Sequence, residues 1–202
     1  MTNVYIFDFG RVIIDFDPTN MTAAYIKDEK DVALAEPIIF DRLYWDRLDE
    51  GTISDEETKQ RICERLPESL HDAARKVYDN WYTNLPKVEG VYEIIEDLKR
   101  EGKRLYLLSN ISLGFAQNYK RVPYLKKVLS LFDGLVFSGE VNMIKPHRDI
   151  FEYLLNKYSL TTRECTFIDD SPVNIAAAKE LDINTYLFDG DAKKLREYIF
   201  GK

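Results

Sequence analysis

The stretch Val4–Asp15 reads VYIFDFGRVIID and decides the fold. Its first four residues form a short apolar run of the kind found in buried strands, and the run ends in the carboxylate of Asp8. Gly10 follows as a turn residue. Because open α/β sheets bind their ligands at the carboxyl ends of the strands, the stretch predicts a strand that carries Asp8 into a binding site.

Three later segments carry the same kind of signal in the same order along the chain. A second apolar run ends in Ser109 and Asn110, Lys145 follows a glycine-containing loop, and a third apolar run ends in Asp169 and Asp170. These residue types suit a nucleophile, a phosphate-binding hydroxyl, a charge-neutralising lysine and a metal site. Together the four segments predict a phosphate-handling centre at one edge of a sheet.

Short apolar strand candidates alternate with helical patterns over most of the chain, which predicts an α/β fold with a doubly wound parallel sheet. The strand candidates are Val4–Phe7, Arg104–Leu108, Leu135–Phe137, Cys165–Ile168 and Asn184–Phe188. The helix candidates are Val91–Leu98, Asp149–Tyr158, a helix opened by Ser171 and Pro172, and a helix that runs from Asp191 to about Phe200.

The pattern changes between residues 17 and 87. Strand-like alternation stops, and apolar residues recur at helical spacing with breaks at residues 17–18, 50–51, 66–67 and 85–86. Ser54–Glu57 has the sequence of a helix-capping box. We therefore expect a helical cap formed by residues 17–87, inserted into a core formed by residues 1–16 and 88–202.

Composition narrows the class of protein. The chain has 202 residues, 45% of them apolar, which fits one domain or one domain with an insertion. Its net charge is −7, so nucleic acid is not an expected partner. No apolar run approaches the roughly 20 residues needed to span a bilayer, so a membrane is not expected either. Two distant cysteines and the absence of a signal-peptide pattern favour a cytoplasmic location.

The four segments resemble the four motifs of the haloacid dehalogenase (HAD) superfamily, and the resemblance extends from Asp8 to Asp170. Residues 51–57, GTISDEE, are similar to the cap signature of the group that contains the small bacterial α-D-glucose-1-phosphate phosphatases and the phosphatase domain of soluble epoxide hydrolase. The resemblance implies a HAD-like Rossmannoid fold. It also implies a Mg²⁺-dependent phosphatase that acts on a small phosphorylated metabolite, most plausibly a sugar phosphate, through an aspartyl-phosphate intermediate.

The resemblance assigns the metal and the nucleophile to three positions. Asp8 would attack phosphorus and also bind Mg²⁺, which prefers oxygen ligands. Asp170 and the backbone carbonyl of Gly10 would be the other protein ligands. Asp169 would lie behind the metal site and orient Lys145 or a metal-bound water.

The phosphate itself would contact the remaining motif residues. The Ser109 hydroxyl and the Asn110 backbone N–H could cradle its oxygens near a helix N-terminus. Lys145 would neutralise its charge and orient Asp8. Asn174 lies where many relatives carry another Asp, although a polar residue on a helix face fits the same pattern.

Gly10 is a departure from the family pattern. Most phosphatases of the superfamily have an Asp there that protonates the leaving oxygen and later activates water, whereas the resembled sugar-1-phosphatase group also has Gly. Without that acid, acidic leaving groups are favoured, so sugar-1-phosphates are the preferred expectation. Asp15 and a metal-bound water are candidates for another acid.

Two other functions stay open at this point. A 2-haloacid dehalogenase would use the Asp8 nucleophile at carbon without a metal, but that family generally lacks a pair such as Asp169 and Asp170. A non-enzymatic binding protein on a HAD fold would fit Gly10, but it would have no need of Ser109 or Lys145. A metal requirement for activity separates the first alternative from a phosphatase.

Overall fold

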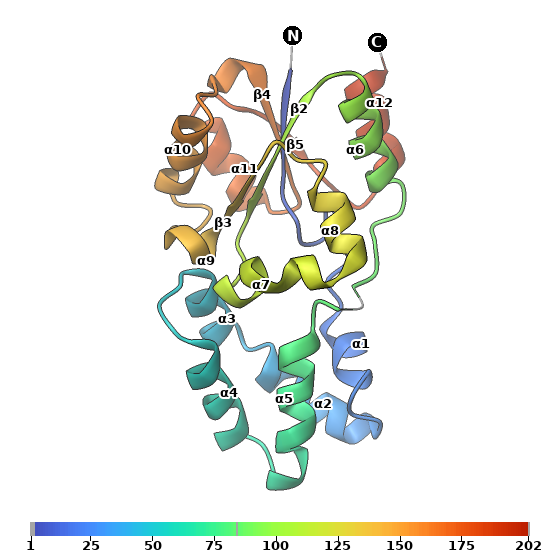
Figure 1. The fold of residues 1–202 in the computed structure, drawn as a ribbon, viewed down its shortest axis with the longest axis vertical. Coiled ribbons are helices and arrows are strands. Elements are labelled where there is room, and N and C mark those ends of the chain that lie inside the picture. The colour runs from blue at the N-terminus through green and yellow to red at the C-terminus, as the bar shows by residue number, and fades with distance from the viewer. Residues whose placement is uncertain (1–2, 84, 202) are drawn as a thin grey trace.

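The computed structural model describes residues 3–83 and 85–201, so residues 1, 2 and 202 of the expected core and residue 84 of the expected cap lie outside the described residues. The described strands form one parallel sheet in the order β3-β2-β1-β4-β5, with helices on both faces (Figure 1). The predicted fold class is confirmed. The strands are β1 (Val4–Phe7), β2 (Arg104–Ser109), β3 (Gly134–Phe137), β4 (Cys165–Asp169) and β5 (Asn184–Leu187).

Alternate residues of the central strand enter two separate hydrophobic clusters. Val4 and Ile6 pack on one face of the sheet, and Tyr5 and Phe7 pack on the other. Because both faces are covered, the strand is apolar along its whole length, as buried parallel strands are. Helices α6 (Val91–Arg100), α8 (Pro123–Leu129) and α12 (Ala192–Phe200) cover the Tyr5 face, and α10 (Arg148–Lys157) and α11 (Pro172–Lys179) cover the Val4 face.

The described elements between residues 17 and 83 are all helical, as expected for that segment. They are α1 (Pro18–Ala23), α2 (Glu29–Ile39), α3 (Arg42–Asp49), α4 (Asp55–Glu64), a short 3₁₀ helix (Glu68–Leu70) and α5 (His71–Asn80). The first expected block is divided into three helices because the carboxylates of Asp28 and Asp41 accept hydrogen bonds from the first turns of α2 and α3. Ser54 caps α4 through the backbone N–H of Glu57, as the capping box predicts.

These helices have a hydrophobic cluster of their own and lie beyond the carboxyl ends of the strands (Figure 1). The two connections to the sheet run side by side, because the Asp15 N–H donates to the Pro86 carbonyl and the Val88 N–H donates to the Ile13 carbonyl. The chain therefore leaves and re-enters the sheet region at one place. The division into a core and a cap at residues 16/17 and 87/88 falls at this crossing and stays a prediction.

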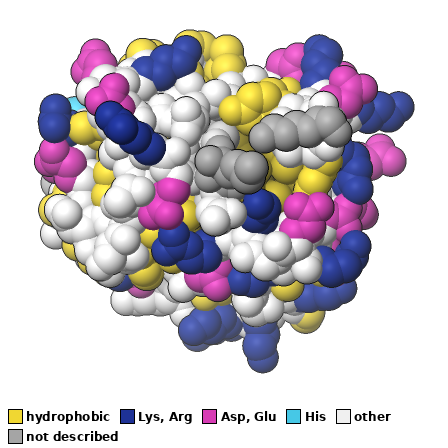
Figure 2. All heavy atoms as spheres, turned by 90° about the horizontal axis from the view of Figure 1, so that it is seen from above, with side chains coloured by type: hydrophobic (Ala, Val, Ile, Leu, Met, Phe, Trp, Pro, Cys, Tyr) yellow, Lys and Arg dark blue, Asp and Glu magenta, His cyan; other side chains and the backbone are white. Residues whose placement is uncertain are grey.

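Four short helices complete the description of these residues. They are α7 (Leu113–Asn118), the 3₁₀ helix Tyr119–Arg121, α9 (Ser138–Val141) and the 3₁₀ helix Thr162–Glu164. Figure 2 shows the end of the molecule farthest from helices α1–α5, where acidic and basic side chains are interspersed. In the described chain, every helix is too short or too polar to cross a membrane.

Candidate active site

Asp8 lies at the centre of the carboxyl edge of the sheet. Its strand, β1, pairs with β2 on one side and β4 on the other, so the following chain segments diverge around it. The Asp8 N–H donates to the Ile168 carbonyl at 2.9 Å, which continues the β1–β4 pairing to the end of the strand. This is the topological switch point at which open α/β sheets bind ligands.

Lys145 is buried against two carboxylates. Its Nζ donates to Oδ1 of Asp8 at 2.7 Å and to Oδ2 of Asp169 at 2.8 Å, and its side chain is only 2% exposed. Its backbone is held just as firmly. The side chain of Asn110 donates to the Lys145 carbonyl and accepts from the Lys145 N–H, both at 2.8 Å. Lys145 is thus held at its ammonium group by the two carboxylates and at its backbone by Asn110.

The two neighbouring aspartates at the end of β4 have opposite surroundings. Asp169 is fully buried, and its oxygens accept hydrogen bonds from Lys145, the Ser171 N–H and the Asn174 side chain. Asp170 is partly exposed, and its carboxylate accepts no hydrogen bond from another described residue. Asp169 therefore has no lone pair left for a strong new ligand, whereas Asp170 does.

The donor set suits a hard divalent cation. Oxygen atoms of Asp8, Asp169 and Asp170 lie within 4.8 Å of one another. Lys145 occupies Oδ1 of Asp8, which leaves Oδ2 without a side-chain partner among the described residues. Three carboxylates face one ammonium group, so a cation such as Mg²⁺ would balance the excess negative charge with the oxygen ligands that it prefers.

The charges at this edge shift the pKa values of the groups. The pKa of Asp8 is raised to about 7, chiefly by burial, with the charge of Lys145 acting to lower it and that of Asp169 acting to raise it. Burial also raises the pKa of Asp170, with a smaller contribution in the same direction from Asp169. Burial alone would lower the pKa of Lys145, but the charges of Asp8 and Asp169 raise it above the ordinary value. Lys145 therefore stays positively charged, and a further cation near the carboxyls would favour their ionised forms.

A cavity of about 590 Å³ opens above these groups. We call its sheet side the cleft floor, which consists of Asp8, Ser109, Lys145, Asp169 and Asp170 with their neighbours. The Ser109 side chain lines the cavity and makes no hydrogen bond with another described residue, so its hydroxyl is available to a ligand. We expected the Ser109–Asn110 pair to lie at a helix N-terminus. Helix α7 begins only at Leu113, so the pair lies before the helix and not at its first turn.

We call the opposite side the cleft roof, and it comes mainly from helices α2, α3 and α5 and the residues beside them. Its lining residues are Phe16, Glu36, Phe40, Arg42, Trp45, Asp49 and Trp81. Phe40 stacks on Trp45 at 5.2 Å between ring centroids, and Trp45 meets Trp81 edge-on at the same distance. The roof therefore combines an aromatic wall with a few charged groups.

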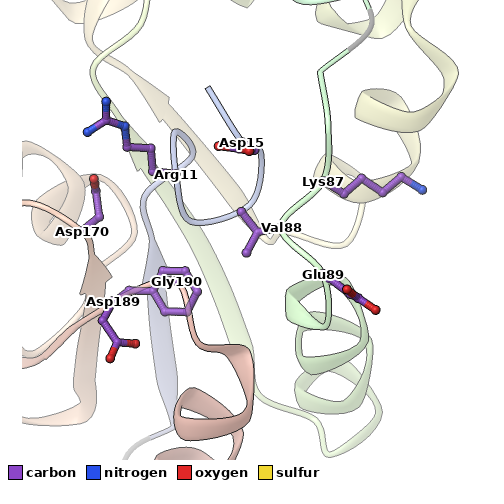
Figure 3. Close-up of a pocket in the computed structure, with 9 residues that line it drawn as sticks. Arg11, Asp15, Lys87, Val88, Glu89, Asp170, Asp189 and Gly190 are labelled. Carbon is purple, nitrogen blue, oxygen red and sulfur yellow. The ribbon is translucent and has the colours of Figure 1, made fainter. Parts of the chain in front are cut away.

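A second cavity, of about 550 Å³, adjoins the first on the side of the chain crossing. In Figure 3, Arg11 and Asp170 extend to the same side of it, whereas Lys87 and Glu89 point outward. Arg11 is shared by the two cavities and lowers the pKa of Asp170 through its charge. Asp15 lines this second cavity and is absent from the lining of the cleft, so it is not placed to act beside Asp8.

The structure brings together Asp8, Gly10, Ser109, Asn110, Lys145 and Asp170 along one cavity, with Asp169 directly behind it. Sequence reasoning missed three contributions. The Asn110 side chain holds the Lys145 backbone, the Asn174 amide holds Asp169, and Asp49 enters the cleft from the roof. Asn174 was visible as a candidate from its spacing after Asp170, but its partner was not.

Comparison with known proteins gives a consistent result. A family model described as haloacid dehalogenase-like hydrolase matches residues 3–182. D-ribitol-5-phosphate phosphatase of Bacteroides thetaiotaomicron is 26% identical over 90% of this chain and 89% of its own length. Sesquiterpene phosphatase astK of Aspergillus oryzae is 22% identical over 86% of this chain and 83% of its own length.

Solved structures show the same fold. A HAD family enzyme from B. thetaiotaomicron, crystallised with magnesium and inorganic phosphate, has a TM-score of 0.71 at 24% identity and covers 96% of this chain and 99% of its own. L-2-haloacid dehalogenase from Xanthobacter autotrophicus has a TM-score of 0.66 at 16% identity and covers 100% of this chain and 84% of its own. At these identities the likeness concerns the fold.

Proposed function

This chain belongs to the haloacid dehalogenase-like hydrolase family, and we propose that it is a Mg²⁺-dependent phosphatase that hydrolyses a small phosphorylated metabolite through an aspartyl-phosphate on Asp8. The observation that carries the proposal is the contrast among three carboxylates. Among the described residues, Asp169 accepts hydrogen bonds on both oxygens, Asp8 has one side-chain partner, Lys145, and the carboxylate of Asp170 accepts no hydrogen bond from another residue. A carbon-centred dehalogenation would have no use for the free Asp170 beside the nucleophile.

Each residue of the cleft floor has a role in this proposal. Lys145 orients Asp8 and offsets the charge of the phosphate, and the Ser109 hydroxyl donates to a phosphate oxygen. Asp8, Asp170 and the Gly10 carbonyl would hold Mg²⁺, which when bound supplies the positive charge that lets an anionic phosphate approach a carboxylate. Asp8 then attacks phosphorus, and water later releases phosphate from Asp8.

Sugar phosphates are the favoured substrates. The relative named D-ribitol-5-phosphate phosphatase supports a polyol or sugar phosphate, and the charged groups of the roof suit a hydroxylated ligand. The preference for sugar-1-phosphates over sugar-6-phosphates follows from Gly10 to the extent that no other group protonates the leaving oxygen.

The test is phosphate release from a panel of sugar phosphates, with Mg²⁺ and with EDTA. We expect turnover that requires Mg²⁺ and falls by about 10⁴-fold or more in Asp8→Asn, whose fold is checked by circular dichroism. Chloride release from 2-chloropropionate is measured in parallel. Metal-independent chloride release, or phosphate release that survives Asp8→Asn, would refute the proposal.

A further inference from the structure

The cleft floor has no side chain at the usual position of the general acid, and the fold does not require that absence. Gly10 has no left-handed backbone angle, and a Cβ built on it meets nothing within 4 Å. A larger residue would therefore fit. The glycine removes a proton donor without a steric reason, so a side chain that protonates the leaving group would have to come from elsewhere in the cavity.

One carboxyl of the cleft roof is placed for this task. Asp49 is the last residue of α3, and it lines the same cavity as Asp8 and Lys145. It makes no hydrogen bond or ion pair with another described residue, whereas Asp46, one turn earlier, pairs with Arg42. A carboxyl that is partly buried in a cleft and lacks a partner is available to a substrate.

The surroundings of Asp49 favour its protonated form. Its pKa is raised to about 8, chiefly by burial; the charges of Arg42 and Lys145 act to lower it, and those of Asp46 and Asp8 act to raise it. Other charged groups also line the cavity, namely Glu36 from α2, and Arg11 and Asp170 from the carboxyl edge of the sheet. A general acid has to hold its proton near neutral pH until the leaving oxygen develops charge, and this site allows that.

We propose that Asp49, carried by the roof helix α3, is the general acid and base of the phosphatase reaction, in place of the side chain absent at Gly10. The inference rests on the proposed function. As Asp8 attacks phosphorus and the bond from phosphorus to the leaving oxygen breaks, that oxygen takes the Asp49 proton and departs as an alcohol. The Asp49 carboxylate then takes a proton from water, whose oxygen attacks phosphorus and releases inorganic phosphate and the Asp8 carboxylate.

This assignment changes the substrate expectation. With an acid on the roof, poor leaving groups such as the primary oxygen of a sugar-6-phosphate become accessible to the wild-type protein. A steep preference for substrates with acidic leaving groups is then expected in a variant that lacks Asp49 and not in the wild type.

The experiment compares kcat/KM for a sugar-6-phosphate, a sugar-1-phosphate and 4-nitrophenyl phosphate in wild type and Asp49→Asn. kcat/KM reports the steps up to departure of the leaving group. Asp49→Asn should lose about 10²–10⁴-fold on the 6-phosphate and less than about tenfold on 4-nitrophenyl phosphate, whose leaving oxygen needs little protonation. A burst of nitrophenol in the variant would report the slowed second step.

Two further variants make the result specific. Asp72→Asn changes the same residue type at an exposed position of α5 that lines neither cavity, and it should leave all three values unchanged. Adding Gly10→Asp to Asp49→Asn should restore turnover of the 6-phosphate, because the position has room for a side chain. An equal loss on all substrates, or no loss on the 6-phosphate, would overturn the role of Asp49 while leaving the dependence on Asp8 intact. A wild type inactive on every phosphate would remove the premise and the inference together.

Discussion

The buried charged groups of the cleft floor and the carboxyl of the cleft roof are held in different ways. On the floor, Lys145 and Asp169 have every polar atom engaged, and Asn110 and Asn174 hold them in place. On the roof, Asp49 has no bonding partner among the described residues and lines the cavity together with Phe40, Trp45 and Trp81. A preorganised floor fixes the reacting groups in advance, and a roof with uncommitted groups leaves room for substrates of different shapes.

The largest effect is expected from removing the positive charge of Lys145 on the cleft floor. Lys145→Met leaves Asp8 and Asp169 buried without their counter-charge, which should cost about 3–5 kcal/mol of unfolding free energy in denaturant titrations. Activity of the folded fraction should fall by at least about 10²–10³-fold. Lys179→Met, an exposed lysine on α11, should change neither quantity. A stable Lys145→Met protein would show that the floor does not depend on this ion pair.

The next effect separates the two aspartates that end β4. Mg²⁺ should raise the melting temperature of the metal-free wild type, because a ligand that binds only the folded state stabilises it. Asp170→Asn should weaken this response by at least about 10²-fold in Mg²⁺ concentration, since a carboxylate is among the few protein ligands that Mg²⁺ uses. Asp189→Asn, on the neighbouring loop, is the control. If Asp170→Asn responds like the wild type and Asp169→Asn does not, the metal ligand is Asp169.

The residues of the cleft floor could be predicted from the sequence, because the order of the strands in the sheet determines where these residues lie. Parallel strands end at one edge of a sheet, so apolar runs that end in Asp8, Ser109 and Asp169–Asp170 had to converge there. The expected strand bounds differ from the observed ones by one residue at most. Ser171 is at the N-cap of α11 as expected, but its hydroxyl makes no capping bond, and its N–H instead donates to Asp169.

The residues of the cleft roof could not be predicted from the sequence, because their positions depend on how the helices pack over the sheet. Helical periodicity identifies the face that packs inward, as it does for the buried Trp45 and Leu48 of α3, but it does not say what the rest of the helix faces. The direction of Asp49 depends on how α3 lies over the sheet. The contacts of Asn110 with Lys145 join residues 35 positions apart and were invisible for the same reason. Only the three-dimensional packing supplies such pairings.

A moderate effect should follow from loosening the floor without removing its charges. Asn110→Ala deletes both hydrogen bonds to the Lys145 backbone and should cost about 1–3 kcal/mol of unfolding free energy. It should also lower kcat more than it raises KM, because Lys145 then loses its fixed position. Asn80→Ala, which removes one exposed helix contact on α5, is the matched control. If Asn110→Ala keeps the wild-type kcat, Lys145 is positioned by its ion pairs alone.

The smallest effect concerns the roof and has the opposite sign. The folded pKa of Asp49 is raised to about 8, so the folded protein holds a proton that the unfolded chain releases near pH 4. The stability that this group contributes is complete below pH 4 and is lost as pH rises toward 8. Asp49→Asn removes the loss, so in metal-free buffer its unfolding free energy relative to the wild type should increase by about 1–2 kcal/mol between pH 4.5 and pH 8.5. The expected change is smaller than the difference between the folded and unfolded pKa values alone would give, because the partly exposed carboxyl can turn toward water.

The same variant is expected to lose turnover of poor leaving groups, so it would gain stability relative to the wild type as pH rises and yet be less active. That combination is typical of a residue kept for chemistry at the expense of stability. Asp8 and Asp170 titrate in both proteins, so the difference between the two reports Asp49 and its coupling to Asp8. Asp72→Asn, at an exposed position of α5, reports the effect of removing a carboxylate that is not in the cleft. Equal pH dependence of stability in the wild type and Asp49→Asn would mean that Asp49 is ionised and solvated in the free protein. The roof would then lack the uncommitted, protonated carboxyl that distinguishes it from the floor.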